Sequence, residues 1–315
     1  MSETVLITGG SGFIGLELAK NLVAEGDRIV IFDVKPPQPL FDGGGAVSYV
    51  KGDITNFSQV LNAVRDFRPQ VIIHLAAILS APSENDPWAS ISVNGMGTYH
   101  ILEAARLFDS KRVILTSSLA VYVNPGYNLE VVTEETPQRP LLVYGVTKVF
   151  SELLGLYYHK KFGIDVRGIR LPVLIGPNVN SPGFGQYNSR LVEAAILGKP
   201  FEVSVPEDTV IPLLYVKDAL RSLILLNKAP EDVLVTRIYN VGQMIPPPST
   251  LDLVNAVRKH YPEAKISFNP DPLITEVNKN TPREIRCDEA QKEWGWYVSY
   301  SLDEMVNDFI TTYTR

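Results

Sequence analysis

Thr4-Val-Leu-Ile-Thr-Gly-Gly-Ser-Gly-Phe-Ile-Gly15 is the stretch of this chain that decides its fold. The apolar run Thr4 to Thr8 predicts a buried strand, and the three glycines that follow predict a tight turn into an amphipathic helix from Phe13 to about Glu25. The first two glycines let the backbone approach a pyrophosphate, the third lets the helix pack on the strand, and the helix N-terminus faces the anion. A glycine triplet alone is a weak signal, because ordinary turns also use glycine.

The next strand strengthens this interpretation. An apolar run from Ile29 to Phe32 ends in Asp33. This acid follows the glycine turn by about 20 residues, where a carboxylate can accept from both hydroxyls of a ribose. Strand, turn, helix and acid together predict a dinucleotide site. Asp33 favours NAD over NADP because its charge would repel a 2′-phosphate, and Lys35 weakens that preference slightly.

Composition and charge exclude several classes of protein and of site. The 315 residues are 45% hydrophobic and 20% charged, with a net charge of −6, as in ordinary soluble proteins. No basic cluster suggests nucleic acid, no apolar run reaches the ~18 residues of a membrane span, and the N-terminus shows no signal pattern. The single cysteine, Cys287, excludes an internal disulfide, and we expect a cytoplasmic protein. The histidines show no metal-ligand spacing, so no metal site is expected.

Strand-like and helix-like segments alternate through the first half of the chain. This pattern predicts an α/β fold with a Rossmann-type doubly wound parallel sheet, covered by helices on both faces. The predicted strands are 4–8, 29–32, 47–50, 71–75, 112–116 and 166–171, and the predicted helices are 13–25, 56–67, 88–108 and one that carries Tyr144 and Lys148. Ligands bind at the carboxyl ends of such strands, so one rim should gather the residues that follow them: Gly9, Asp33, Asp53, Ala76 and Ser118.

We expect two domains. The NAD-binding Rossmann domain would comprise residues 1–175 plus about 207–244. A smaller substrate-binding domain would comprise about 176–206 and 245–315, where the alternation is lost and proline-rich pieces separate shorter elements. The smaller domain should close over the substrate.

Tyr144-Gly-Val-Thr-Lys148 puts a phenol and an ammonium on the same face of a helix, because side chains four residues apart project from one side. The lysine favours the phenolate, so the tyrosine can exchange a proton nearer neutral pH than its free pKa of about 10 allows. The same helix contains a second such pair, Tyr157 and Lys161. At ~100° per residue the second pair points to roughly the opposite face, and we expect it at the surface.

Other residues have two open interpretations. Ser118 is favoured over Ser117 as the hydroxyl beside Tyr144. Asp53 either contacts an adenine or caps a loop. His74 follows an apolar strand and is expected to be a buried histidine with satisfied hydrogen bonds rather than a catalytic one. Structural or surface roles are also favoured for Asn94, Gly97, Arg283, Arg286, Cys287, Trp294 and Trp296.

Taken in order, the motifs resemble the extended short-chain dehydrogenase/reductase family, which includes NAD-dependent epimerases and dehydratases. They are Thr8-Gly-Gly-Ser-Gly-Phe-Ile-Gly15, Gly52-Asp53, His74-Leu-Ala-Ala77, Thr116-Ser-Ser-Leu-Ala-Val-Tyr122, Tyr144-x-x-x-Lys148 and Arg170-Leu-Pro172. The resemblance covers nearly the whole chain and implies an NAD-dependent enzyme with catalytic Ser118, Tyr144 and Lys148. The cofactor-binding residues that it implies are Gly9, Gly12, Phe13, Ile14, Gly15, Asp33, Asp53, Ile54, Leu75, Ala76, Ala77, Tyr144, Lys148 and Pro172.

Within this family, several stretches are similar to the short-chain type of L-threonine 3-dehydrogenase: 75–81, 144–154, 208–215 and 293–295. One segment departs from that type. Those enzymes carry a Gly-Gly-Gly-Thr-Thr stretch that grips the amino acid, whereas this chain reads Pro182-Gly-Phe-Gly-Gln-Tyr187. The resemblance implies substrate contacts from Ser80, Ser118, Gly183 and Gln186, and the departure leaves open whether threonine or another hydroxy compound is bound.

The leading hypothesis is NAD-dependent oxidation of a secondary alcohol of a small polar substrate, with the 3-hydroxyl of L-threonine as one candidate. The alternative is a nucleotide-sugar epimerase or dehydratase with tightly bound NAD. Many such enzymes have an arginine in a stretch that here reads Val210-Ile-Pro-Leu-Leu-Tyr-Val216, and Leu119-Ala120 supplies no acid/base pair for a dehydratase. A non-catalytic dinucleotide sensor is disfavoured, because such proteins usually lose the tyrosine or the lysine. The helix with this pair often forms a dimer face in the family, which implies a homodimer, although Val149, Leu153 and Leu156 could equally belong to the core. Because the sequence has no basic cluster and no long apolar run, no nucleic-acid or membrane partner is expected.

Overall fold

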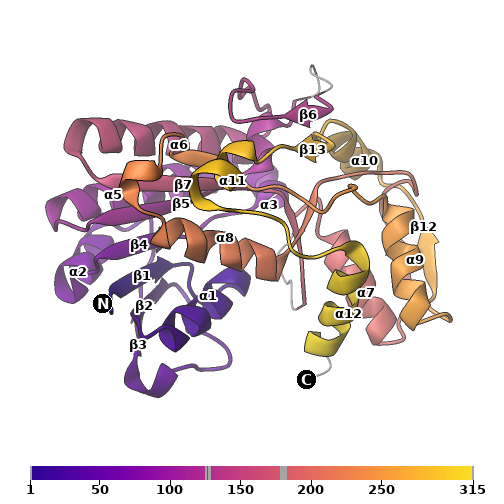
Figure 1. Ribbon diagram of the computed structural model, residues 1–315, viewed down its shortest axis with the longest axis horizontal. Coiled ribbons are helices and arrows are strands. Elements are labelled where there is room, and N and C mark those ends of the chain that lie inside the picture. The colour runs from indigo at the N-terminus through magenta and orange to yellow at the C-terminus, as the bar shows by residue number, and fades with distance from the viewer. Residues whose placement is uncertain (1, 125, 127–128, 178–182, 314–315) are drawn as a thin grey trace.

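Seven parallel strands form the central sheet of the computed structural model, which describes residues 2–124, 126, 129–177 and 183–313 (Figure 1). Their order is β11-β7-β5-β4-β1-β2-β3. Because the order reverses between β1 and β4, ligands are expected at the carboxyl ends of the strands there. The predicted doubly wound α/β fold is confirmed. The strands are β1 Thr4–Thr8, β2 Arg28–Asp33, β3 Val47–Lys51, β4 Val71–His74, β5 Arg112–Ser118, β7 Asp165–Leu171 and β11 Ile238–Asn240.

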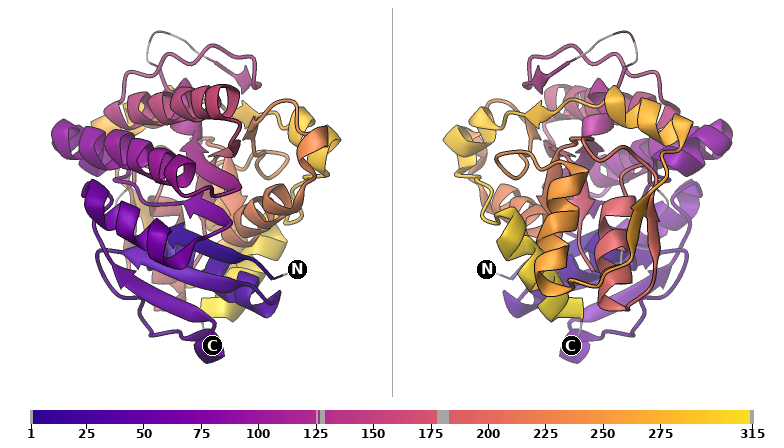
Figure 2. Two further views of the ribbon diagram at one scale, coloured as in Figure 1. Left: turned by 90° about the vertical axis from the view of Figure 1, so that its left-hand side faces the viewer. Right: turned by 90° about the vertical axis from the view of Figure 1, so that its right-hand side faces the viewer.

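Helices cover both faces of the sheet, as its strands require. Successive strand residues point to opposite faces, so Val5 packs against α1 (Phe13–Ala24) and α8 (Val216–Lys228) on one side. Its neighbour Leu6 packs on the other side, where Figure 2 shows the violet to magenta helices stacked. These helices are α2 Phe57–Phe67, α5 Gly97–Leu107 and α6 Val143–Phe162. Burial on both faces explains why the strands read as continuous apolar runs.

The long helix predicted over 88–108 is instead built in three parts. A short helix α4 (Pro87–Ser90) leads into a π-helical turn, η2 (Ile91–Met96), before α5 begins. The wide turn carries Asn94, whose side chain accepts from the Ile78 amide at 2.8 Å and donates to the Ile78 carbonyl at 3.0 Å. The same amide group donates to Thr147 of α6 at 3.1 Å. Asn94 therefore fastens the chain that leaves β4 to helix α6.

Three pairs of short strands and six further helices complete the described part of the chain. The pairs are β8 with β10, β9 with β12, and β6 with β13. These elements are β6 Val131–Val132, β8 Val173–Ile175, β9 Phe201–Val203, β10 Leu213–Tyr215, β12 Ile266–Phe268, β13 Glu284–Ile285, α3 Ser80–Asn85 (which precedes them), α7 Tyr187–Ile196, α9 Thr250–His260, α10 Pro272–Lys279, α11 Asp288–Trp294 and α12 Leu302–Tyr313, and the 3₁₀ turns are η1 Gly43–Gly45, η3 Leu119–Tyr122 and η4 Glu231–Val233.

Helix α11 brings the C-terminal segment back to the main sheet. The ring of Trp294 lies 5.6 Å from that of Tyr239 in β11, and Trp296 is fully buried. Both tryptophans thus belong to the core, as expected. Residues 288–296 pack on the sheet, although the smaller domain was predicted to comprise 245–315, and the division into two domains stays a prediction.

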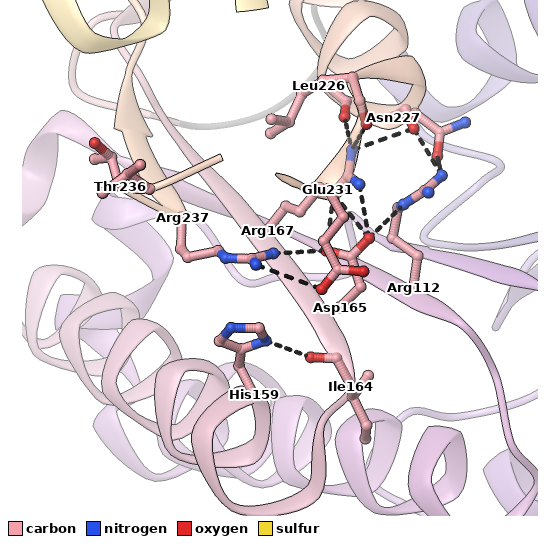
Figure 3. A network of polar contacts seen from close by, with 12 residues as sticks. Arg112, His159, Ile164, Asp165, Arg167, Leu226, Asn227, Glu231, Thr236 and Arg237 are labelled. Carbon is pink, nitrogen blue, oxygen red and sulfur yellow. Dashed lines mark hydrogen bonds and ion pairs between the residues drawn. The ribbon is translucent and has the colours of Figure 1, made fainter. Parts of the chain in front are cut away.

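A buried charge network fastens the edge of the sheet where the strands begin. Figure 3 shows three guanidinium groups around the carboxylate of Asp165, the first residue of β7. Arg112, Arg167 and Arg237 lie at 3.0, 2.7 and 2.9 Å from it. Arg167, which is fully buried, also donates to the carbonyl of Ala229 just after α8. Burial raises the pKa of Asp165, but Arg167 and Arg112 outweigh it and hold the pKa below its ordinary value.

Candidate active site

A cavity of about 620 Å³ lies along the carboxyl ends of the strands. The parallel pairing places the residues that follow β1, β2, β4, β5 and β7 on one rim, which forms its floor. Every candidate site residue lines this cavity: Gly9, Gly12, Phe13, Ile14, Gly15, Asp33, Asp53, Ile54, Leu75, Ala76, Ala77, Ser80, Ser118, Tyr144, Lys148, Pro172, Gly183 and Gln186. The sequence therefore predicted where the site lies, while the role of each residue stays a prediction.

The glycine turn has the close approaches that a pyrophosphate cradle needs. Gly9 has a φ of +67°, and a Cβ on it would lie 2.8 Å from the amide nitrogen of Ala76. A Cβ on Gly15 would lie 2.5 Å from the Cα of Gly10, so only glycine allows the helix to pack this closely. Helix α1 begins at Phe13 with no side-chain cap and no acid in its first turn. Its first amides and its dipole therefore suit the phosphates of a dinucleotide.

Two carboxylates lie at the other end of the rim. Asp33 closes β2, and its two oxygens accept from the amides of Ser11 at 3.0 Å and Lys35 at 3.2 Å. Asp53 accepts from the amide of Thr55 at 2.8 Å and also lines the cavity. The loop-capping interpretation of Asp53 is confirmed, and it leaves the carboxylate beside the space for a base. These residues fit the adenosine half of NAD.

Tyr144 enters the cavity from the first turn of α6. The helix can approach the turn η3 because Gly145 has no side chain to collide with the Ala120 carbonyl. The Ser118 hydroxyl hydrogen-bonds to the Tyr144 phenol and accepts from the Ala120 amide at 3.2 Å. One turn along the helix, Lys148 donates to the Thr116 carbonyl at 2.7 Å, and its Nζ lies 5.6 Å from the centre of the Tyr144 ring.

Burial governs the ionisation of this pair. It raises the pKa of Tyr144 to about 12, against a lowering by the hydrogen bond from Ser118. Burial also lowers the pKa of Lys148 to about 8, although the charge of Glu152 raises it. The structure thus differs from the expected lowering of the phenol's pKa by the lysine. The ammonium is directed at the Thr116 carbonyl, and loss of water around the phenol is the larger effect.

The neighbouring serine points away from the phenol. Ser117 donates to Glu152, a buried carboxylate that also pairs with Arg170 at 2.9 Å. Because successive residues of β5 face opposite sides, only one of the two serines can face Tyr144. The geometry supports the choice of Ser118. Glu152 was not predicted from the sequence, although it lies on α6 one turn beyond Lys148.

His74 is buried and the second tyrosine-lysine pair is exposed, as predicted from the sequence. His74 shares hydrogen bonds with Thr8 at 2.7 Å and Thr98 at 3.2 Å, and burial lowers its pKa to about 3. It is therefore a neutral, satisfied, buried histidine. Tyr157 is 53% exposed, and Lys161 is exposed as well. This pair lies at the surface, away from the cavity.

Much of the remaining cavity wall was not predicted. It includes residues outside the predicted motifs, in loops and in α10: Val123, Leu142, Val277, Asn278 and Thr281. Apolar residues at these positions look like ordinary core, so only the folded chain shows that they face the site. Arg283 and Arg286 do not line it, since they pair with Glu130 and Asp288 at the surface.

Residues 5–242 match the sequence pattern of the NAD dependent epimerase/dehydratase family. The chain belongs to this family. A mitochondrial L-threonine 3-dehydrogenase from Bos taurus is 30% identical over 98% of this chain and 82% of its own length. An uncharacterised epimerase/dehydratase from Staphylococcus haemolyticus is 31% identical over 96% of this chain and 95% of its own length.

Solved structures agree with these relatives. An L-threonine dehydrogenase from Clostridium difficile superposes with a TM-score of 0.90 at 31% identity, over 99% of this chain and 98% of that one. The holo form of an L-threonine dehydrogenase from Cupriavidus necator gives a TM-score of 0.89 at 30% identity, over 98% and 99%. The predicted NAD-dependent dehydrogenase of the extended short-chain type is confirmed. Within the described residues, no helix is long and apolar enough to cross a membrane.

Proposed function

We propose that this protein oxidises a secondary alcohol to a ketone with NAD⁺. The observation that carries the proposal is the group of half-buried Ser118 with buried Tyr144 and Lys148, which shares one cavity with the uncapped helix start and the glycine turn. A hydroxyl donor, a phenol and an ammonium beside a dinucleotide cradle are the parts that alcohol oxidation needs.

The residues divide the work as follows. Ser118 and Tyr144 hold the substrate hydroxyl, and the Tyr144 phenolate removes its proton. Lys148 supplies a positive charge that offsets only part of the effect of burial on the phenol, and its hydrogen bond to the Thr116 carbonyl fixes the ammonium in the cavity. Bound NAD⁺ would supply the hydride acceptor and a positive charge. The first amides of α1 would hold its phosphates, and Asp33 its adenosine ribose.

L-Threonine is the first substrate to test, because one of the relatives and both of the solved structures named above are L-threonine dehydrogenases. The experiment is a screen for NADH absorbance with L-threonine, L-serine, simple hydroxy acids and uncharged alcohols. A dehydrogenase accumulates NADH in proportion to substrate consumed. An epimerase regenerates its bound NAD in each cycle, so substrate conversion without net NADH would contradict the proposal.

Cofactor preference follows from Asp33. Its carboxylate lines the cavity at the end of β2, so a 2′-phosphate there would meet a negative charge. We expect NAD⁺ to be used at least tenfold more efficiently than NADP⁺, with Lys35 reducing the gap. Steady-state kinetics with the two cofactors measure this ratio.

We also propose a homodimer through α6. Val146, Phe150, Leu153 and Tyr157 form an apolar stripe along this helix, and each side chain is 46–60% exposed. Their spacing puts them on one face, which a second copy of the chain would cover. A related protein is described as a monomeric L-threonine 3-dehydrogenase. Light scattering tests the dimer: we expect the mass of two chains for the wild type and of one chain for Leu153→Glu. A wild-type mass of one chain would contradict the dimer.

A further inference from the structure

The wall around the Ser118–Tyr144 pair is built from apolar side chains. Leu119, Val123, Leu142 and Val173 pack together in one cluster that begins at the residue after Ser118, and all four line the cavity. Phe184 adds an aromatic side chain from the loop that precedes α7. A substrate whose hydroxyl reaches Ser118 therefore meets hydrocarbon on this side, while the polar side chains of Ser80, Gln186, Asn278 and Thr281 line other parts of the cavity.

Gln186 supplies a single unsatisfied acceptor in this wall. Its Oε1 is enclosed and has no hydrogen-bond partner among the residues that the structure describes. The side chain lies against the loop, since a Cβ on Gly183 would be 3.2 Å from the Cγ of Gln186. Ser80 lies nearby, where its hydroxyl accepts from the amide of Phe184 at 3.4 Å. A buried acceptor without a donor is costly, so a donor on the ligand would be stabilised here.

The charged side chains that line the cavity lie away from this apolar wall. In the described part of the cavity they belong to Asp33, Asp53 and Lys148. The two carboxylates lie at the ends of β2 and β3, in the part assigned to adenosine, and the Lys148 ammonium is bonded to Thr116. Residues 178–182, which lie outside the described part of the chain, read Asn-Val-Asn-Ser-Pro and contain no charged residue. An amino acid zwitterion would bring a carboxylate and an ammonium against hydrocarbon, where unpaired charges are strongly disfavoured.

We propose that the substrate is an uncharged secondary alcohol with an apolar body and one further hydrogen-bond donor, which donates to Oε1 of Gln186. The inference rests on the proposed dehydrogenase function and names the substrate class of that same site. In the reaction, the carbinol carbon loses a hydride to NAD⁺ and its hydroxyl loses a proton to Tyr144. The carbon–oxygen bond becomes a ketone, and the second donor of the substrate stays intact.

The test compares molecules that share the reacting hydroxyethyl group. Butane-2,3-diol has a hydroxyl in place of the ammonium of L-threonine and a methyl group in place of its carboxylate, and 1-phenylpropane-1,2-diol adds an aromatic body. With the full-length protein and NAD⁺, we expect kcat/KM for at least one of these diols to exceed that for L-threonine by about tenfold or more, measured as NADH formation for each stereoisomer.

Equal or faster oxidation of L-threonine would overturn the inference and leave the dehydrogenase function standing. If none of the alcohols in the screen yields NADH, the dehydrogenase function itself fails, so the two failures are distinguishable.

The role of Gln186 is tested by the variant Gln186→Leu. Butan-2-ol is the control substrate, because it has the reacting hydroxyl of the diol and lacks the second donor. We expect the ratio of kcat/KM for butane-2,3-diol to that for butan-2-ol to fall about fivefold to tenfold, mainly through KM of the diol. An unchanged ratio in a variant that still binds NAD⁺ and melts near the wild-type temperature would overturn the contact.

Discussion

Helix α6 carries the same tyrosine-lysine pair twice, in two environments. Tyr144 and Lys148 are buried in the cavity, whereas Tyr157 and Lys161 are exposed on the outer side of the helix. The first pair has Ser118 and the Thr116 carbonyl as partners, and burial moves the pKa of both its groups. The comparison teaches that the spacing of the motif only puts two groups on one side of a helix. Enclosure and neighbouring strands give them chemistry.

The largest expected effect is from the phenol. Tyr144→Phe removes the proton acceptor and should lower kcat/KM by about 1,000-fold, because general base catalysis contributes about 10²–10⁴. Tyr157→Phe makes the same chemical change on the exposed side and should stay within about twofold of the wild type. NADH formation measures both. An equal loss of kcat/KM in the two variants would contradict the assignment of Tyr144 as the base.

The lysines provide the second contrast. Lys148→Met removes the charge beside the phenol and should lower kcat/KM by about 100-fold, the effect of a shift of about two pKa units in the base. Lys161→Met is the matched control, and its activity should be unchanged. Both variants are assayed at saturating NAD⁺, so that weaker cofactor binding is not mistaken for slower proton transfer. A normal rate for Lys148→Met would show that the charge is not needed.

The adjacent serines sharpen the comparison on the strand side. Ser118→Ala removes a hydrogen bond to the reacting hydroxyl and the phenol, and should lower kcat by about 30-fold with little change in melting temperature. Ser117→Ala should lower the melting temperature with little change in kcat. It removes a hydrogen-bond donor from the buried Glu152, which should cost about 1–3 kcal/mol in stability. Calorimetry and initial rates on both variants separate the two roles. The same pattern in both would contradict the assignment.

The smallest expected effect is on the pH profile. Burial holds the pKa of Tyr144 at about 12, so the phenolate fraction still rises between pH 7 and 8 and oxidation should speed up, by at most about tenfold. The slope should decrease above pH 8, because Lys148, with a pKa of about 8, then begins to lose its charge. Log kcat/KM plotted against pH measures this. A rate that falls as pH rises from 7 would exclude the phenolate as base.

The sequence could predict those parts of the molecule that depend on local pattern. The glycine turn, Asp33, Ser118 and the α6 pair follow from strand and helix periodicity, because all parallel strands end at one edge. The π-helical turn at Asn94 could not be predicted, since Ile91–Met96 has an ordinary helical composition. The contributions of Val123 and Leu142 to the apolar wall were also missed, because which hydrophobic side chains face a cavity depends on packing between distant segments.

The arginine cluster around Asp165 decides how the chain can be divided. Its members come from three stretches: the start of β5, the first residues of β7, and the segment before β11. Arg167 needs carbonyl groups that follow α8, and β7 needs β11 as its outer neighbour. A fragment ending at residue 175 would keep the glycine turn and the catalytic pair. It would also leave the outer edge of β7 unpaired and the buried guanidinium of Arg167 without its carbonyl partner. The nucleotide-binding half is therefore not an independent module, and shortened versions of the protein must extend past residue 240.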